Sequence, residues 1–224
     1  MSETLLIELQ QAMPLVMEPL DLTGTVLTGV DLPEGSGKTG LIIVDIVNGF
    51  ATVGAANLAP AGLNAQVSRM VAEPPYPPHC EIGTGEENLV PELLWLEDEP
   101  GATLVRKDCI NGFIGAYRAD GSNALLDWLN REQIGAVLAV GICTDICVMD
   151  MVLTLLSARN HDMAPSLRDI HVYDQGCATF DLPRALAEEL DLGIAAAHPQ
   201  DATHHMGLYF MAARGAHLVD KVEI

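Results

Sequence analysis

Positive charge is scarce in this sequence. Its 224 residues hold 11 lysines and arginines against 31 aspartates and glutamates, a formal net charge of −20. So acidic a surface repels phosphate backbones and anionic headgroups, which disfavours nucleic acid and membranes as partners. No apolar run approaches the roughly 20 residues that a membrane-spanning helix needs. The opening segment Met1–Glu8 also lacks the basic region of a signal peptide, so we expect a cytoplasmic protein.

Regular disulfide spacing is also missing. Five cysteines, an odd number, are scattered at positions 80, 109, 143, 147 and 177. In a chain without signs of secretion this pattern indicates reduced thiols in a reducing compartment, and it leaves room for a reactive one.

What the chain does have is enough apolar sequence for one sizeable core. Hydrophobic residues make up 49% of it, and its length favours a single domain. Short β-branched runs typical of strands buried on both faces occur at 41–47, 102–106, 136–140 and 170–173, with weaker signals at 25–28 and 216–222. Helix-like stretches lie at 3–17, 57–72, 123–131 (with Ser122 as its N-cap), 145–159, 182–191 and 200–214. This alternation predicts an α/β fold with a parallel sheet and right-handed crossovers.

Parallel sheets bind ligands beyond the carboxyl ends of their strands, and three reactive side chains lie at such places. Asp45 lies inside an apolar run, where a carboxylate is either a structural cap or a general base. Lys107 follows the 102–106 run and is either a solvated lysine or a cation beside a thiolate. Cys147 opens a helix, where free N–H groups favour the thiolate and lower the thiol pKa; a plain buried thiol is the alternative.

At these residues the chain resembles the isochorismatase-like cysteine hydrolases, and within them the nicotinamidases of the plant type. The resemblance rests on spaced motifs that occur in the family's order and covers roughly residues 41–72 and 74–222. The matching segments are 41–50 (LIIVDIVNGF), 77–80 (PPHC), 106–113 (RKDCINGF), 140–148 (VGICTDICV) and 176–183 (GCATFDLP).

The resemblance implies a catalytic triad of Asp45, Lys107 and Cys147. It implies that Asp45 deprotonates Cys147, that Lys107 stabilises the charge, and that the thiolate attacks a carboxamide to give a thioester, which water hydrolyses. The oxyanion donors then fall on the backbone N–H groups of Cys143 and Cys147, and a cis peptide bond falls between Ile142 and Cys143. The implied reaction is the conversion of nicotinamide to nicotinate and ammonia, as in NAD salvage.

The resemblance also assigns substrate and metal residues, and here the sequence departs from the family. Phe50 matches an aromatic residue of the pyridine pocket, and Tyr76 stands where the family often has tryptophan. His79 matches one ligand of a divalent metal, often zinc. The Asp-x-His that supplies the other ligands is absent together with its strand, because the chain passes from Ala72 directly to Glu73 and a proline-rich segment. A lone histidine is a poor zinc site, since even catalytic zinc takes three protein ligands.

We therefore expect a single-domain, three-layer α/β/α fold with a mainly parallel sheet, lacking one strand after the first helix. Residues 1–40 form an N-terminal helix and lead-in, and residues 41–224 the hydrolase domain. Without the missing strand, 102–106 should pair directly with 41–47. The His204–His205 pair is expected to be surface or packing histidines.

Two alternatives to a nicotinamidase stay open: a metal-independent relative that hydrolyses another small amide, and a catalytically weak family member that acts as an oligomer partner. The resemblance also implies self-association into a homo-oligomer.

Overall fold

A computed structural model describes residues 18, 20–22, 25–28, 38–52 and 80–223 of the chain. Its strands are β1 (Val26–Thr28), β2 (Lys38–Val44), β3 (Ile134–Ile142), β4 (Asp169–Ala178), β5 (His217–Val219) and β6 (Lys221–Glu223). Its α-helices are α2 (Asn48–Ala51), α4 (Gly112–Gly115), α5 (Ala124–Glu132), α6 (Met149–Asn160), α7 (Arg184–Glu189) and α8 (Gln200–Ala212). Two 3₁₀ helices, Pro91–Glu97 and Ile194–Ala196, and a π-helical turn, Thr144–Val148, complete the list.

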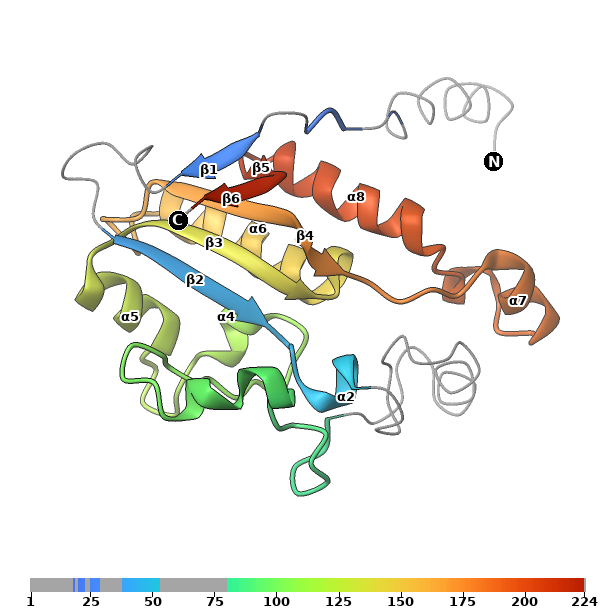
Figure 1. The fold of residues 1–224 in the computed structure, drawn as a ribbon, viewed down its shortest axis with the longest axis horizontal. Coiled ribbons are helices and arrows are strands. Elements are labelled where there is room, and N and C mark those ends of the chain that lie inside the picture. Colours follow the sequence, from blue (N-terminus) through green and yellow to red (C-terminus); the bar gives the residue numbers. More distant parts are fainter. Residues whose placement is uncertain (1–17, 19, 23–24, 29–37, 53–79, 224) are drawn as a thin grey trace.

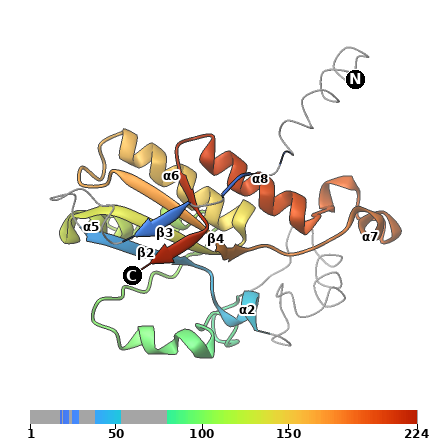
Figure 2. The same cartoon turned by 45° about the horizontal axis from the view of Figure 1, so that its top comes forward.

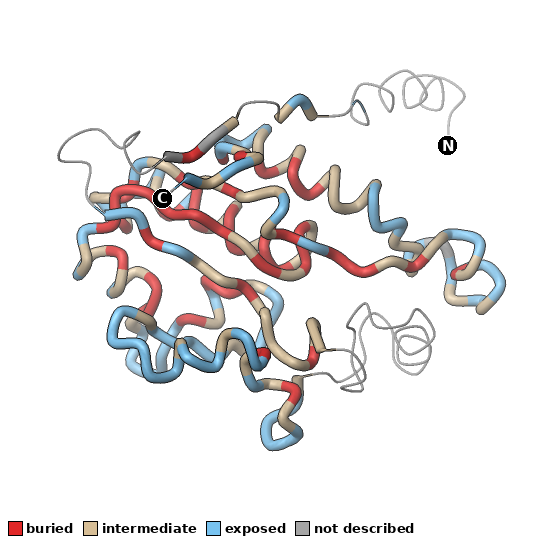
Figure 3. The backbone as a smooth tube through the Cα atoms, viewed as in Figure 1, coloured by how far each residue is buried: buried red, intermediate tan, exposed pale blue. Residues whose placement is uncertain are grey.

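The main sheet is parallel throughout, with the strand order β2-β3-β4-β5, and a separate parallel pair joins β1 to β6 (Figure 1). The apolar run of β3 lies almost entirely out of solvent, as expected for a strand covered on both faces (Figure 3). The predicted parallel α/β fold is confirmed. None of the described helices has the length and apolar character needed to traverse a bilayer.

The two faces of the sheet are covered differently in the described part of the chain. Side chains of α5, α6 and α8 share one apolar core with alternate residues of β3 and β4, among them Leu129, Leu155 and Met211, each at most 1% exposed. Leu138 points to the opposite face and packs with the β1–β6 pair. Figure 2 shows α6 and α8 lying along the sheet. The helices predicted over 3–17 and 57–72 lie outside the described residues.

The N-cap of α5 differs from its prediction. Asn123, rather than Ser122, accepts hydrogen bonds through its side-chain oxygen from the N–H groups of Leu125 (3.0 Å) and Leu126 (3.1 Å). The Ser122 hydroxyl instead donates to Asp120 at 2.7 Å. Both residue types cap helices well, so the sequence pattern alone could not separate two adjacent candidates.

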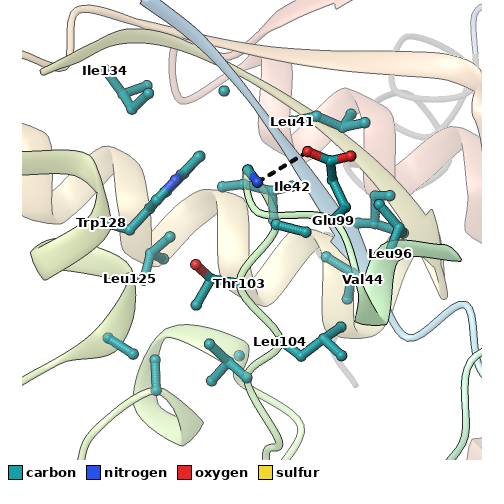
Figure 4. A pocket seen from close by; sticks show the side chains of 18 of the residues that line it. Leu41, Ile42, Val44, Leu96, Glu99, Thr103, Leu104, Leu125, Trp128 and Ile134 are labelled. Carbon is teal, nitrogen blue, oxygen red and sulfur yellow. Dashed lines mark hydrogen bonds between the residues drawn. The ribbon is translucent and has the colours of Figure 1, made fainter. Parts of the chain in front are cut away.

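The expected strand at 102–106 and its pairing with 41–47 are wrong. Residues 102–106 form no strand and join no ladder with any other described residue, and β2 forms the edge of the described sheet. A cavity of about 910 Å³, here called the β2 groove, lies beside β2 and is bordered by residues 99–105 and by α5 (Figure 4). Leu41 and Leu104, both more than half exposed, line it. Residues 99–105 and β2 are therefore separated by a groove instead of being joined in a ladder.

Close contact between β2 and β3 generates a first prediction. Gly141 in β3 has φ +137°, and a Cβ atom there would lie 2.1 Å from the carbonyl oxygen of Val44. We expect Gly141→Ala to lower the free energy of unfolding by about 2 kcal/mol or more, because it adds both backbone strain and overlap. Urea unfolding followed by circular dichroism measures this change.

The matched control is Gly101→Ala, whose added Cβ would approach only the flexible carboxylate of Glu99, at 3.3 Å. Its effect should stay within about 0.5 kcal/mol, as for most surface substitutions. Equal unfolding midpoints for the two variants would contradict the role given to Gly141.

Candidate active site

The three reactive residues singled out in the sequence lie close together, two of them just beyond the carboxyl ends of neighbouring strands. Asp45 directly follows β2, and Cys147 lies in the π-helical turn after β3. Lys107 comes from the extended segment on the far side of the β2 groove. Because β2 and β3 are parallel neighbours, their ends bring Asp45 and the turn to the same edge of the sheet.

Lys107 is the centre of this cluster. Its Nζ lies 2.9 Å from Oδ2 of Asp45, 3.7 Å from Sγ of Cys147 and 3.0 Å from the carbonyl oxygen of Cys109. The Lys107 and Asp45 side chains are only 18% and 14% exposed. The structure thus brings together the three side chains that the resemblance joins in a triad.

Burial and charge set the protonation states of these groups. Burial and, after it, the Asp45 carboxylate raise the pKa of the Cys147 thiol to about 12, because Lys107 opposes the rise only in part. The lowered pKa expected from the helix N-terminus is therefore wrong, because desolvation and a neighbouring anion outweigh the backbone dipoles. Burial by itself would lower the pKa of Lys107, but Asp45 and Cys147 more than compensate and raise it. At neutral pH the site holds a thiol beside a lysine–aspartate ion pair.

The turn that carries Cys147 has one of the backbone features implied by the resemblance. The Ile142–Cys143 peptide bond is cis. The carbonyl oxygen of Cys143 accepts hydrogen bonds from the N–H groups of Ile146 and Val148, both at 3.1 Å. The Cys143 thiol is buried, and burial raises its pKa to about 12.

A second cavity, of about 530 Å³, opens onto the three residues and is here called the substrate pocket. Cys147, Lys107 and Asp45 line it together with Phe50, which lies in α2 at the mouth of the described site. Cys80, Val47 and Leu89 contribute to its wall. Tyr76, the other residue predicted for the pyridine ring, lies outside the described residues.

The described residues do not supply a metal site. His79 lies outside them, and within the ranges that the structure describes no three or more histidine, cysteine, aspartate or glutamate side chains gather so as to hold a metal ion. Zinc needs several such ligands in tetrahedral reach, so these residues do not fit the group that the resemblance implies.

Sequence reasoning missed a set of polar residues behind the turn. Asp145 pairs with His198, and Thr144 pairs with His204, each at 2.8 Å. The histidine expected to be a surface or packing residue, His204, thus contacts the residue that opens the turn. Asp145 lies inside the 140–148 motif, two residues before Cys147, and this was the one local signal of the network. The histidines lie more than fifty residues further along the chain, so no spacing rule connects them to the motif.

Comparison with known proteins agrees with this architecture. The isochorismatase domain matches residues 64–221. Nicotinamidase 1 of Arabidopsis thaliana is 49% identical over 213 residues, covering 83% of this chain and 86% of that protein.

Solved structures share the fold at low identity. An isochorismatase-like hydrolase from Alkaliphilus metalliredigens is 17% identical and covers 84% of this chain and 94% of its own, with a TM-score of 0.54. A nicotinamidase/pyrazinamidase from Bacillus subtilis is 20% identical and covers 82% and 100%, with a TM-score of 0.53. The parallel sheet, the position of the cluster at its carboxyl edge and these matches lead to one conclusion: the chain belongs to the isochorismatase family of hydrolases.

Proposed function

We propose that this protein is an amide hydrolase that converts nicotinamide and water to nicotinate and ammonia through a thioester on Cys147. The observation that carries the proposal is the convergence of Cys147, Lys107 and Asp45 on one pocket. The 49% identity to a plant nicotinamidase supports nicotinamide as the amide.

The first half of the proposed reaction makes the thioester. Asp45 takes the proton of the Cys147 thiol, and the sulfur attacks the carboxamide carbon as the C=O bond opens to an oxyanion. The backbone N–H groups of Cys143 and Cys147 are the proposed donors to that oxyanion. When the oxyanion collapses, the C–N bond breaks, and the proton held by Asp45 passes to the nitrogen, which leaves as ammonia.

The second half returns the enzyme to its starting state. Asp45 takes a proton from water, the resulting hydroxide attacks the thioester carbon, and the C–S bond breaks to release the acid. The proton on Asp45 then returns to the sulfur. Lys107 stays charged throughout, because its raised pKa holds the proton, and it stabilises each anion in turn.

The remaining expectations belong to the same proposal. Phe50 and Tyr76 contact the pyridine ring, and Phe50 already lines the substrate pocket. The steps above use only the chain's own groups, and metal analysis of the purified protein tests whether His79 holds a zinc ion. Self-association stays a prediction that multi-angle light scattering checks, and the cytoplasmic location stays a prediction that fractionation checks.

Loss of the nucleophile gives the most direct prediction. Cys147→Ala should lower kcat for ammonia release from nicotinamide by at least about 10³-fold, because no thioester can form. Cys177→Ala is the matched control: its thiol is also buried, with its pKa raised to about 12, but it lies in β4 and lines neither cavity.

The assay also separates the alternatives. Parental activity in Cys147→Ala would rule out the thioester mechanism. Turnover of other amides but not of nicotinamide, still dependent on Cys147, would identify a relative with another substrate. No turnover of any amide, in protein with a normal unfolding transition, would identify a catalytically weak family member.

Neutralising Asp45 should have opposite effects on turnover and on thiol reactivity. The Asp45 carboxylate is one of the groups that raise the pKa of Cys147, so Asp45→Asn lowers that pKa and increases the thiolate fraction at pH 8. Alkylation of Cys147 by iodoacetamide, followed by mass spectrometry, should therefore become faster. Turnover should fall at least about 10²-fold, because the general base is lost. Slower alkylation in this variant would contradict the electrostatic effect assigned to the Asp45 carboxylate, and parental turnover would contradict the proposed proton transfer.

The raised pKa of Cys147 also predicts how alkylation of the parent protein depends on pH. With a pKa of about 12, the Cys147 thiol is protonated below that pH, and its alkylation rate should keep rising with pH well above 9. The exposed thiol of Cys109 should react faster at pH 7.5, since the solvent reaches it.

A further inference from the structure

The turn that carries Cys147 is pressed against helix α8. A Cβ atom on Gly207 of α8 would lie 2.8 Å from the Cα atom of Asp145, so the helix backbone and the turn are in direct contact. Cys147 itself is only 8% exposed. Any group that holds this turn against α8 therefore also sets the position of the reactive sulfur.

One such group is a hydrogen-bonded chain from β4 through α8 to the turn. Oδ1 of Asp174 in β4 lies 2.8 Å from Nε2 of His204, and Nδ1 of His204 lies 2.8 Å from Oγ1 of Thr144, the first residue of the turn. The carboxylate can only accept, so Nε2 of His204 donates to it. In the neutral ring Nδ1 is then an acceptor, and the Thr144 hydroxyl donates to it.

Asp174, His204 and Thr144 are linked as the carboxylate, imidazole and hydroxyl of a hydrolytic triad are, but this hydroxyl is out of reach of a substrate. Thr144 is fully buried, at 0% exposure, and neither cavity at the site is lined by it. A nucleophilic hydroxyl must meet its substrate, so the chain of bonds acts on the turn rather than on a second ligand.

A second pair holds the other side of the turn. Nε2 of His198 lies 2.8 Å from Oδ2 of Asp145, and Nδ1 of His198 lies 2.9 Å from the carbonyl oxygen of Phe180. The Thr179 hydroxyl donates to Oδ1 of Asp145 at 2.7 Å. Burial acts to raise the pKa of Asp145, but the hydrogen bonds from His198 and Thr179, with the charge of His198, together outweigh it and hold that pKa below its usual range. Asp145 is thus anchored through both of its oxygens.

We propose that His204, held by Asp174 and bonded to Thr144, is a positioning residue that fixes the turn so that Cys147 Sγ meets Lys107 and Asp45. The proposal rests on the proposed function, because its kinetic test measures the turnover of nicotinamide. Its physical basis is the narrow tolerance of the site: the Lys107 Nζ to Cys147 Sγ distance is already 3.7 Å, and a misplacement of about 1 Å costs a rate factor of about 10².

The test compares Thr144→Val with Thr144→Ser. Valine keeps the shape of threonine but has no hydroxyl, so His204 loses its partner. Serine keeps the hydroxyl but removes a buried methyl group, which lowers stability through packing alone. We expect Thr144→Val to lower kcat for nicotinamide by about 30- to 100-fold with KM changed less than about 3-fold, and Thr144→Ser to stay within about 5-fold of the parent.

This pair separates positioning from a merely structural role. If Thr144 only contributed packing, activity would follow thermal stability, and the serine variant would be at least as impaired as the valine variant. Equal kcat values for the two variants, or a parental kcat for Thr144→Val, would overturn the proposal.

His204→Gln provides the second arm, with His205→Gln as its matched control. Glutamine can still donate to Asp174, but its amide does not reproduce the acceptor that faces Thr144. We expect a kcat loss like that of Thr144→Val, and no further loss when the two changes are combined, because both break the same bond. His205, whose ring centroid lies 6.4 Å from that of Tyr209 on the same helix, should tolerate glutamine with less than about 2-fold change. Additive losses in the double variant would contradict the shared bond.

Alkylation of Cys147 tests the positioning without any substrate. Releasing the turn should expose the sulfur, so Thr144→Val should react with iodoacetamide at least about 5-fold faster than the parent, whereas Thr144→Ser should not. A parent that hydrolyses no nicotinamide would refute the proposed function, and the alkylation rates would still decide the positioning proposal. Equal alkylation rates for parent and Thr144→Val would overturn it even in an active enzyme.

Discussion

The ion pair between Lys107 and Asp45 is the contact on which the site depends. Removing two charges from water is costly and is offset only when they meet at short range, as they do here at 2.9 Å. In a chain of net charge −20, this one ammonium group also faces the Cys147 sulfur and the carbonyl oxygen of Cys109. The same pair reaches across the β2 groove, so a single contact both sets the electrostatics of the site and fixes the segment that carries Lys107.

The raised pKa of Cys147 changes how the nucleophile is generated. A thiolate would be present before the reaction only if the helix dipole and Lys107 stabilised it by more than burial costs. They do not, because the pKa of the Cys147 thiol is about 12. In the proposed reaction the sulfur becomes reactive as its proton moves to a base, and Asp45 is the proposed base within the cluster. Asp45 raises the pKa as an anion and relieves it by accepting the proton, so the thiol remains protected until an amide carbon is in place to share the charge.

Local patterns predicted most of the fold, and what they missed depends on partners distant in the chain. The strands β2, β3 and β4 could be predicted from their apolar runs, because a strand that is buried on both faces needs apolar residues at nearly every position. The run at 102–106 has a similar composition. A strand forms only when a neighbouring strand completes its hydrogen bonds, and the sequence does not show which segments become neighbours. The triad residues were identified because they lie in motifs at strand ends. His204 was not, because its partner Thr144 is sixty residues away and a histidine on a helix has no pattern of its own.

The two halves of the site are held by different kinds of force. The Cys147 half is fixed by packing of α8 against the turn and by hydrogen bonds in which both partners are largely buried, interactions that salt hardly weakens. The Asp45 half borders the β2 groove at the edge of the described sheet, and the Lys107–Asp45 charge pair crosses that groove at the site. A close-packed contact has one geometry, whereas a charge pair tolerates small shifts because its energy falls slowly with distance. The packed half therefore fixes the position of the sulfur, and the charge pair sets the electrostatics of the groove side.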